Sequence, residues 1–172
     1  LVLCPQRLKY QRKNQTTKSL RVLRLSQTLK NMWTEIKEQP DIDKLLELYG
    51  HFHDSCLRDI YITTREFIDE KLAMHFDNKL TASLLFQRQF GPTTVLELKF
   101  EDVEQFNFRP FDESTNAVIY DATLLTKDGL FYWADYADWK TGDNDSIWIS
   151  GKKLFWRLRP ELIGNVTRLN DE

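Results

Sequence analysis

The chain has 172 residues, of which 41% are hydrophobic, and a formal net charge of −2, which favours a folded domain and argues against wholesale disorder. Its two cysteines, Cys4 and Cys56, form neither a disulfide framework nor a zinc-binding pattern, and they indicate free thiols in a reducing compartment. Its apolar runs fall far short of the roughly 20 residues that cross a bilayer. We therefore expect a cytoplasmic protein without a membrane segment.

The charge is distributed unevenly along the chain. Residues 1–50 carry ten Lys and Arg against five Asp and Glu, whereas residues 51–172 carry fourteen against twenty-one. A basic arm suits an anionic partner, so nucleic-acid binding through this arm is one hypothesis. The alternative is that the arm is solvated or lies on the acidic body. We divide the chain into 1–50, a basic N-terminal arm with helices that pack on the body, and 51–172, a β-rich domain.

Two helices are predicted near the N-terminus, after a polar and basic arm at 1–16. Apolar residues at three- and four-residue steps predict a first helix that starts near Thr17. Its apolar stripe consists of Val22, Leu25, Leu29, Met32, Trp33 and Ile36. Pro40 interrupts this pattern, and a short second helix is expected at 41–49, where Gly50 supplies the stop signal.

After Gly50 the hydrophobic period changes to two, which is typical of strands. Residues 65–78 are either a polar connection or a strand pair, and Lys127-Asp128-Gly129 predicts a tight hairpin. The expected strands lie near 55–64, 80–89, 95–100 with a continuation to 108, 117–126, 130–134, 147–149 and 154–158. About seven short strands predict an α+β fold that is mostly antiparallel β, a sandwich or an open barrel, preceded by one or two N-terminal helices.

The segment HFHDSC is the first candidate site. On a strand, His51 and His53 would share a face, and Asp54 or Cys56 could approach a metal ion held by them, with His75 as a possible further ligand. This pattern yields the alternative hypothesis of a metal-dependent hydrolase. The competing interpretation is that Asp54 caps backbone donors where a strand begins. We assign no catalytic residue and no cofactor.

An acidic loop with aromatic residues is the second candidate site. Aromatic anchors surrounded by charge are typical of protein interfaces. The predicted surface consists of Trp133, Asp135, Tyr136, Asp138, Trp139, Asp143 and Asp145. The alternative is that most of these rings belong to the core. The run Asp143-Asn144-Asp145 lacks the Gly and Glu of a calcium-binding loop.

Several segments between about Leu46 and Arg157 resemble a family of small uncharacterised bacterial proteins. The resemblance is carried by LYGHFHDSCLRDI, LLFQRQF, VLELKFEDV, IYDATLLTKDGLFYWAD and LFWRL. It implies no activity and no assigned site. In style only, small acidic domains of this sort are similar to immunity proteins that neutralise toxins.

Our leading hypothesis from the sequence is therefore a cytosolic protein-binding domain, of the immunity-protein kind, rather than an enzyme. It would occlude a basic protein partner with its acidic aromatic surface, and charge would steer the encounter. The metal-dependent hydrolase and the nucleic-acid-binding arm are the two alternatives.

Overall fold

The computed structural model describes residues 32–110, 117–166 and 168. The chain divides into two units, 1–32 and 33–172, and the account below concerns the second. The expected helix before residue 32, the basic arm and Cys4 lie outside the described residues. No helix in the described part of the chain has the length and hydrophobicity needed to cross a lipid bilayer.

One α-helix, ten strands and two short 3-10 helices make up the described part of this unit. In chain order they are β1 (Thr34–Ile36), α2 (Gln39–Tyr49), η1 (Gly50–Phe52), β2 (Ser55–Thr64), β3 (Phe67–Ile68), β4 (Met74–His75), β5 (Leu80–Arg88), β6 (Val95–Asn107), β7 (Val118–Ile119), β8 (Thr123–Lys127), β9 (Leu130–Ala134), β10 (Trp148–Leu158) and η2 (Pro160–Leu162).

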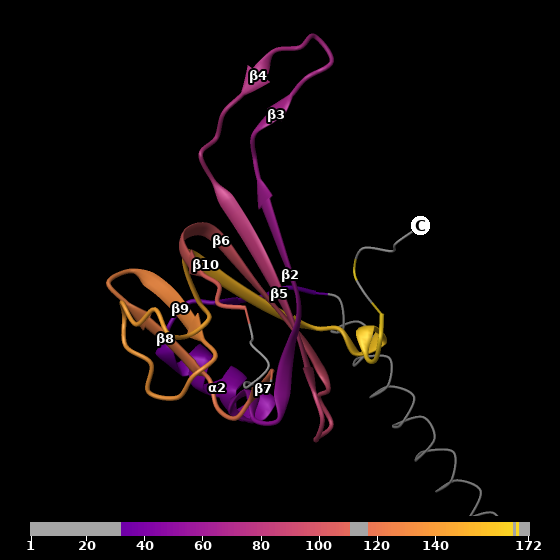
Figure 1. Ribbon diagram of the computed structural model, residues 1–172, viewed down its shortest axis with the longest axis vertical. Helices are drawn as coiled ribbons and strands as arrows, with labels where there is room; N and C mark the ends of the chain where they lie inside the picture. Colours follow the sequence, from indigo (N-terminus) through magenta and orange to yellow (C-terminus); the bar gives the residue numbers. More distant parts are fainter. Residues whose placement is uncertain (1–31, 111–116, 167, 169–172) are drawn as a thin grey trace, which may run out of the picture. The chain divides into compact units, whose positions relative to one another are not determined.

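The main sheet is antiparallel and strongly curled into a half-barrel (Figure 1). Its strands follow the order β7-β2-β5-β6-β10-β9-β8, and β1 pairs with the far end of β10. Strands β3 and β4 form a separate two-stranded ribbon. The predicted fold class, α+β with mostly antiparallel β, is confirmed, and the half-barrel corresponds to the open-barrel alternative.

Helix α2 covers the concave face of the sheet. It places Ile42, Leu45 and Tyr49 in the core and ends at Gly50, whose left-handed conformation (φ 57°) lets the chain reverse. Pro40 lies in its first turn, where the missing N–H costs nothing, so it begins the helix instead of merely separating two helices.

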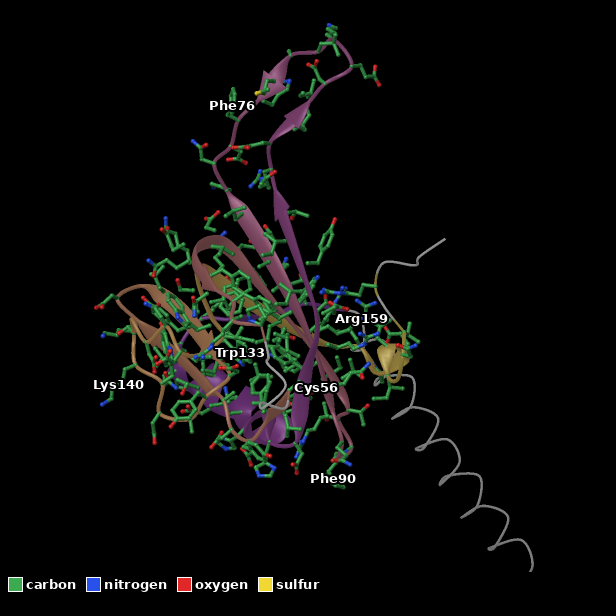
Figure 2. The ribbon with its side chains drawn as sticks, viewed as in Figure 1. Cys56, Phe76, Phe90, Trp133, Lys140 and Arg159 are labelled. Atoms are coloured by element: carbon green, nitrogen blue, oxygen red, sulfur yellow. The ribbon has the colours of Figure 1, made fainter. Side chains whose placement is uncertain are left out.

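A chain of aromatic rings fills the space between α2 and the sheet. Phe52 contacts Tyr49, Phe86 and Trp133, with ring centroids 5.1, 5.0 and 6.1 Å apart. Figure 2 shows Trp133 in the middle of this body. These four rings join the helix to strands β5 and β9, which are far apart in the sequence, in one core.

The prediction for residues 33–36 was wrong. Trp33 and Ile36 were expected on the stripe of the first helix, but residues 34–36 form β1 and pair with Trp156, Phe155 and Leu154. One long strand, β10, also replaces the predicted pair at 147–149 and 154–158, whereas the predicted continuation of the strand at 95–100 is confirmed. Strand β6 runs unbroken through residue 107, and β10 continues through a bulge between Ser150 and Gly151.

Candidate functional site

The predicted acidic aromatic surface is divided by the structure into buried and exposed members. Trp133 and Trp139 are buried, so the expectation that they are surface anchors was wrong. Trp133 lies in the main core, and Trp139 packs on Tyr132 and Trp148 in a second cluster on the other side of β9. Tyr136 is the exposed aromatic residue of the predicted set.

The four aspartates of this loop differ in the same way. Asp135 is half-buried and accepts a hydrogen bond from the N–H of Ile147 at 3.0 Å, and burial raises the pKa of its carboxyl. Asp143 accepts from the N–H of Asp145 at 2.9 Å. Asp138, Asp143 and Asp145 are exposed. Two of the four carboxylates therefore hold the loop in shape, which is the turn chemistry expected of such residues.

The HFHDSC segment does not form the extended metal clamp that was considered. His51 lies in η1 with φ 55°, not on a strand, so it does not share a strand face with His53. The Nδ1 of His53 lies 2.8 Å from Asp54, and Cys56 follows on β2 as a half-buried free thiol. His75, the possible further ligand, lies on β4.

Across the described residues, no group of three or more His, Cys, Asp or Glu side chains is arranged to hold a metal ion. The competing interpretation, in which the side chain of Asp54 caps backbone donors, stays a prediction. The backbone of this segment does contact distant parts of the chain. The N–H of Ala122 donates to the carbonyl of His51 at 3.1 Å, and the N–H of Gln89 donates to that of Asp54 at 3.0 Å. The segment therefore ties three parts of the chain together.

No protein-family model matches this chain, and neither does any curated protein or solved structure. The resemblance carried by the HFHDSC and related segments therefore stays a prediction, and the candidate site rests on geometry alone.

The strand-pair alternative for residues 65–78 is confirmed by the pairing of β3 with β4, but sequence analysis missed that this ribbon is a projecting arm with an apolar surface. Strands β2 and β5 continue beyond the rest of the sheet into the β3–β4 ribbon (Figure 1). The arm, residues 65–79, exposes a set of large apolar side chains: Phe67, Ile68, Leu72, Met74 and Phe76. Leu72 at the turn is 85% exposed and Phe76 is 71% exposed. Figure 2 shows Phe76 on the arm, apart from the side chains that cover the sheet.

Polar contacts give the arm a defined conformation. Asp69 caps the turn by accepting from the N–H groups of Lys71 and Ala73 at 2.9 and 3.0 Å. Its other oxygen lies 3.0 Å from Nε2 of His75, and this contact and the backbone donors hold the pKa of Asp69 below its usual value. The ring of His75 stacks on Phe67 with centroids 4.5 Å apart.

The two faces of the ribbon carry different side chains. Phe67 and His75 are cross-strand partners on one face, and Ile68 and Met74 are partners on the other. Phe76 follows His75 by one residue and so belongs to the face of Met74. The face with Ile68, Met74 and Phe76 therefore carries three exposed apolar side chains, and by the same alternation it also carries Glu66. A cluster of exposed apolar side chains is typical of a docking surface.

A buried ionic cluster is the second feature that sequence analysis missed. Glu97 on β6 has a side chain only 3% exposed, and its Oε2 accepts from Nε of Arg157 at 2.7 Å and from Nη1 of Arg159 at 2.8 Å. Its Oε1 accepts from Nη1 of Arg168 at 2.6 Å, and Arg168 also contacts Asp59 and the carbonyl of Ser83.

This cluster is a structural anchor. Burial raises the pKa of Glu97, but the guanidinium groups outweigh burial and keep that pKa below its usual value. Three arginines contact the two carboxylate oxygens, so the carboxylate of Glu97 is the centre of an ion-pair network. The cluster holds the segment that follows β10 against the convex face of the sheet, where Leu162 packs on Leu85 and Val95.

Proposed function

We propose that this chain is a protein-binding domain whose arm, residues 65–79, inserts into an apolar cleft of its partner. The observation that carries the proposal is the exposure of five large apolar side chains, three of them on one face, on a ribbon that stands away from the core. Folded monomers rarely leave such patches uncovered, and aromatic residues and Met are enriched at interfaces. Insertion of an arm acts by occlusion, which is also how an immunity protein would act.

The low net charge of the arm fits a partner whose binding surface is apolar. Residues 65–79 hold three basic and four acidic side chains, a net charge of −1. Several of these charges are paired within the unit: Arg65 with Asp77 at 2.8 Å and Lys79 with Asp102 at 3.7 Å. Such an arm offers little long-range steering, so binding through it should depend only weakly on salt.

The acidic loop is retained as a secondary contact. Four members of the predicted surface are exposed and within reach of a partner: Tyr136, Asp138, Asp143 and Asp145. Binding through them would weaken as salt rises, in contrast to binding through the arm. We also retain a cytosolic location in this proposal, supported by the free thiol of Cys56.

The test compares two phenylalanines of similar exposure. Phe76 lies on the arm, and Phe90, which is 58% exposed, lies in the turn between β5 and β6. Affinity capture from native lysate with the wild-type chain, Phe76→Ser and Phe90→Ser should retain a protein on wild type and Phe90→Ser that Phe76→Ser loses, at both low and high salt. Equal retention by both variants, or no retained protein on wild type, would overturn the proposal.

A fourth sample separates the arm from the acidic loop. Tyr136→Ser removes the exposed ring of the loop and leaves the arm unchanged. If Tyr136→Ser loses the partner while Phe76→Ser keeps it, and if salt releases the partner from wild type, then the loop is the binding surface and the arm is not. All three variants should unfold within about 0.5 kcal/mol of wild type, because each changes a surface residue.

A further inference from the structure

Strand β2 has a free edge that is distinct from the arm. Strand β7 pairs only with Ser55 and Cys56, and from residue 58 to residue 64 no described strand lies on the side of β2 opposite to β5. Successive residues of a strand direct their N–H and C=O groups to alternate sides. About half of the residues in this free edge, 58–64, therefore direct their backbone groups away from the sheet.

The free edge lacks the features that usually prevent strand addition. Proteins protect edges with Lys, Pro, bulges, short strands or covering elements. Here the bulge between Leu57 and Asp59 and the contacts of Arg58 with Asn165 and of Asp59 with Arg168 protect only the start. Residues 60–64 read IYITT, which contains no charge and no Pro and consists of strong strand formers. The opposite edge of the sheet, β8, has five residues, ends at Lys127 and is contacted by α2.

We propose that this free edge pairs antiparallel with the same edge of a second copy of the chain, about a two-fold axis that passes beside Tyr61. Tyr61 is the middle residue of the edge, so this register pairs the edge over its whole length. Tyr61 then faces its own symmetry mate, and Ile60 faces Ile62 of the second copy. Aromatic and β-branched cross-strand pairs of this kind stabilise antiparallel sheets.

The charges of the edge fit this register. Arg58 faces Thr64 of the second copy, and Asp59 faces Thr63, so no like charges stand opposite each other. Tyr61 is 47% exposed and lies on the convex face, and Ile62 is 45% exposed and lies on the concave face with its partner Ala82. Dimerisation would therefore cover apolar side chains on both faces of a sheet made continuous across the two copies.

The two-fold axis provides a sharp test, because a charge placed at residue 61 meets itself. Sedimentation equilibrium of the full chain should show a dimer for wild type. Tyr61→Lys and Tyr61→Glu should each weaken the dimer by at least about tenfold, since like charges then stand directly opposite each other. An equimolar mixture of the two variants should restore the dimer, since opposite charges now meet at the axis.

Leu72→Lys is the matched control, because it adds the same charge to an exposed apolar site on the arm. Leu72→Lys should leave the dimer intact. If Leu72→Lys loses the dimer while the Tyr61 variants keep it, the copies meet through the arm. That result would overturn the edge proposal. A monomeric wild type at all concentrations, or a mixture that fails to restore the dimer, would also overturn it. The arm proposal is tested separately by Phe76→Ser, so the two can fail independently.

Discussion

The substitution Glu97→Gln should lower the free energy of unfolding by about 3 kcal/mol, near the lower end of the range found when one partner of a buried ion pair is removed. Glutamine keeps the shape of the side chain but not its charge, so three guanidinium groups would face one another around a neutral amide. Their side chains are only 14–21% exposed, which limits the relief that water can give. The amide oxygen can still accept from one arginine, which is why we expect the lower end of the range.

Urea unfolding followed by tryptophan fluorescence measures this change. With a slope of about 1–3 kcal/mol per M, a loss of about 3 kcal/mol moves the midpoint by about 1–3 M. Glu101→Gln is the matched control, since Glu101 lies on the same strand and pairs with Lys99 at 2.7 Å but is more exposed. It should cost less than about 1 kcal/mol. Equal and small shifts for both variants would refute the view that Glu97 is an anchor.

The same comparison has a pH dependence of defined sign. The pKa of Glu97 in the folded state lies below its ordinary value of 4.5, so the ionised group stabilises the fold. This contribution is fully present above about pH 4.5 and is lost as pH falls through the lower, folded-state pKa. The difference between wild type and Glu97→Gln should therefore be constant from pH 5 to pH 7 and shrink below about pH 4.5. A difference that persists at lower pH would contradict the assignment.

Three further substitutions test the core and the turns. Gly50→Ala should cost about 1–2 kcal/mol in urea unfolding, because φ is +57° and the new Cβ would lie 2.4 Å from Nη2 of Arg88, which must move. Trp133→Ala should cost about 3–5 kcal/mol in the same assay, since it empties the centre of the core. Asp135→Asn should raise the melting temperature slightly at pH 7, with a gain below about 1 kcal/mol, because burial penalises the charge while an amide oxygen still accepts from Ile147. A lower melting temperature for Asp135→Asn would show that the charge itself is needed.

Local sequence signals were sufficient to predict the boundaries of elements that begin or end at one or two characteristic residues. The second helix ends where Gly50 predicts, and the hairpin at residues 127–129 joins β8 to β9 as expected. Strand β2 occupies residues 55–64, as its period of two indicates. In these cases turn chemistry and alternation agree with the tertiary fold. The elements can therefore be predicted without knowing which distant residues they contact.

The failure at residues 33–36 has a physical cause. A short apolar run is compatible with either a helix or a strand. Here the conformation of residues 34–36 is determined by the pairing of β1 with β10, which lies more than one hundred residues away.

The prediction that Trp133 and Trp139 are exposed was wrong for a related reason. Strand β9 is buried on both faces, with Phe131 and Trp133 in one cluster and Tyr132 and Ala134 in the other. Alternation cannot indicate which side is exposed when neither side is.

Glu97 illustrates what sequence alternation can and cannot predict. Its outward direction follows from alternation, since it lies on the convex face opposite to Leu96 and Leu98. Its burial was not predictable, because that burial depends on Arg159 and Arg168, which follow β10 and fold back over the sheet. A polar residue on the outer face of a strand is therefore exposed only if no later segment of the chain returns to it.

The hairpin from β2 to β5 shows the converse case, in which apolar residues of an alternating pattern are exposed. Residues Ile60 and Ile62 have the same alternating pattern, yet Ile60 packs on the core while Ile62 is exposed at the free edge. Beyond them, Phe67 and Phe76 continue the apolar character into the arm, where the main sheet provides no neighbours to bury them. Hydrophobicity along this hairpin therefore exceeds what its own unit can cover. The excess is located at the edge and the arm, which is why we infer that a second copy covers the former and a partner protein the latter.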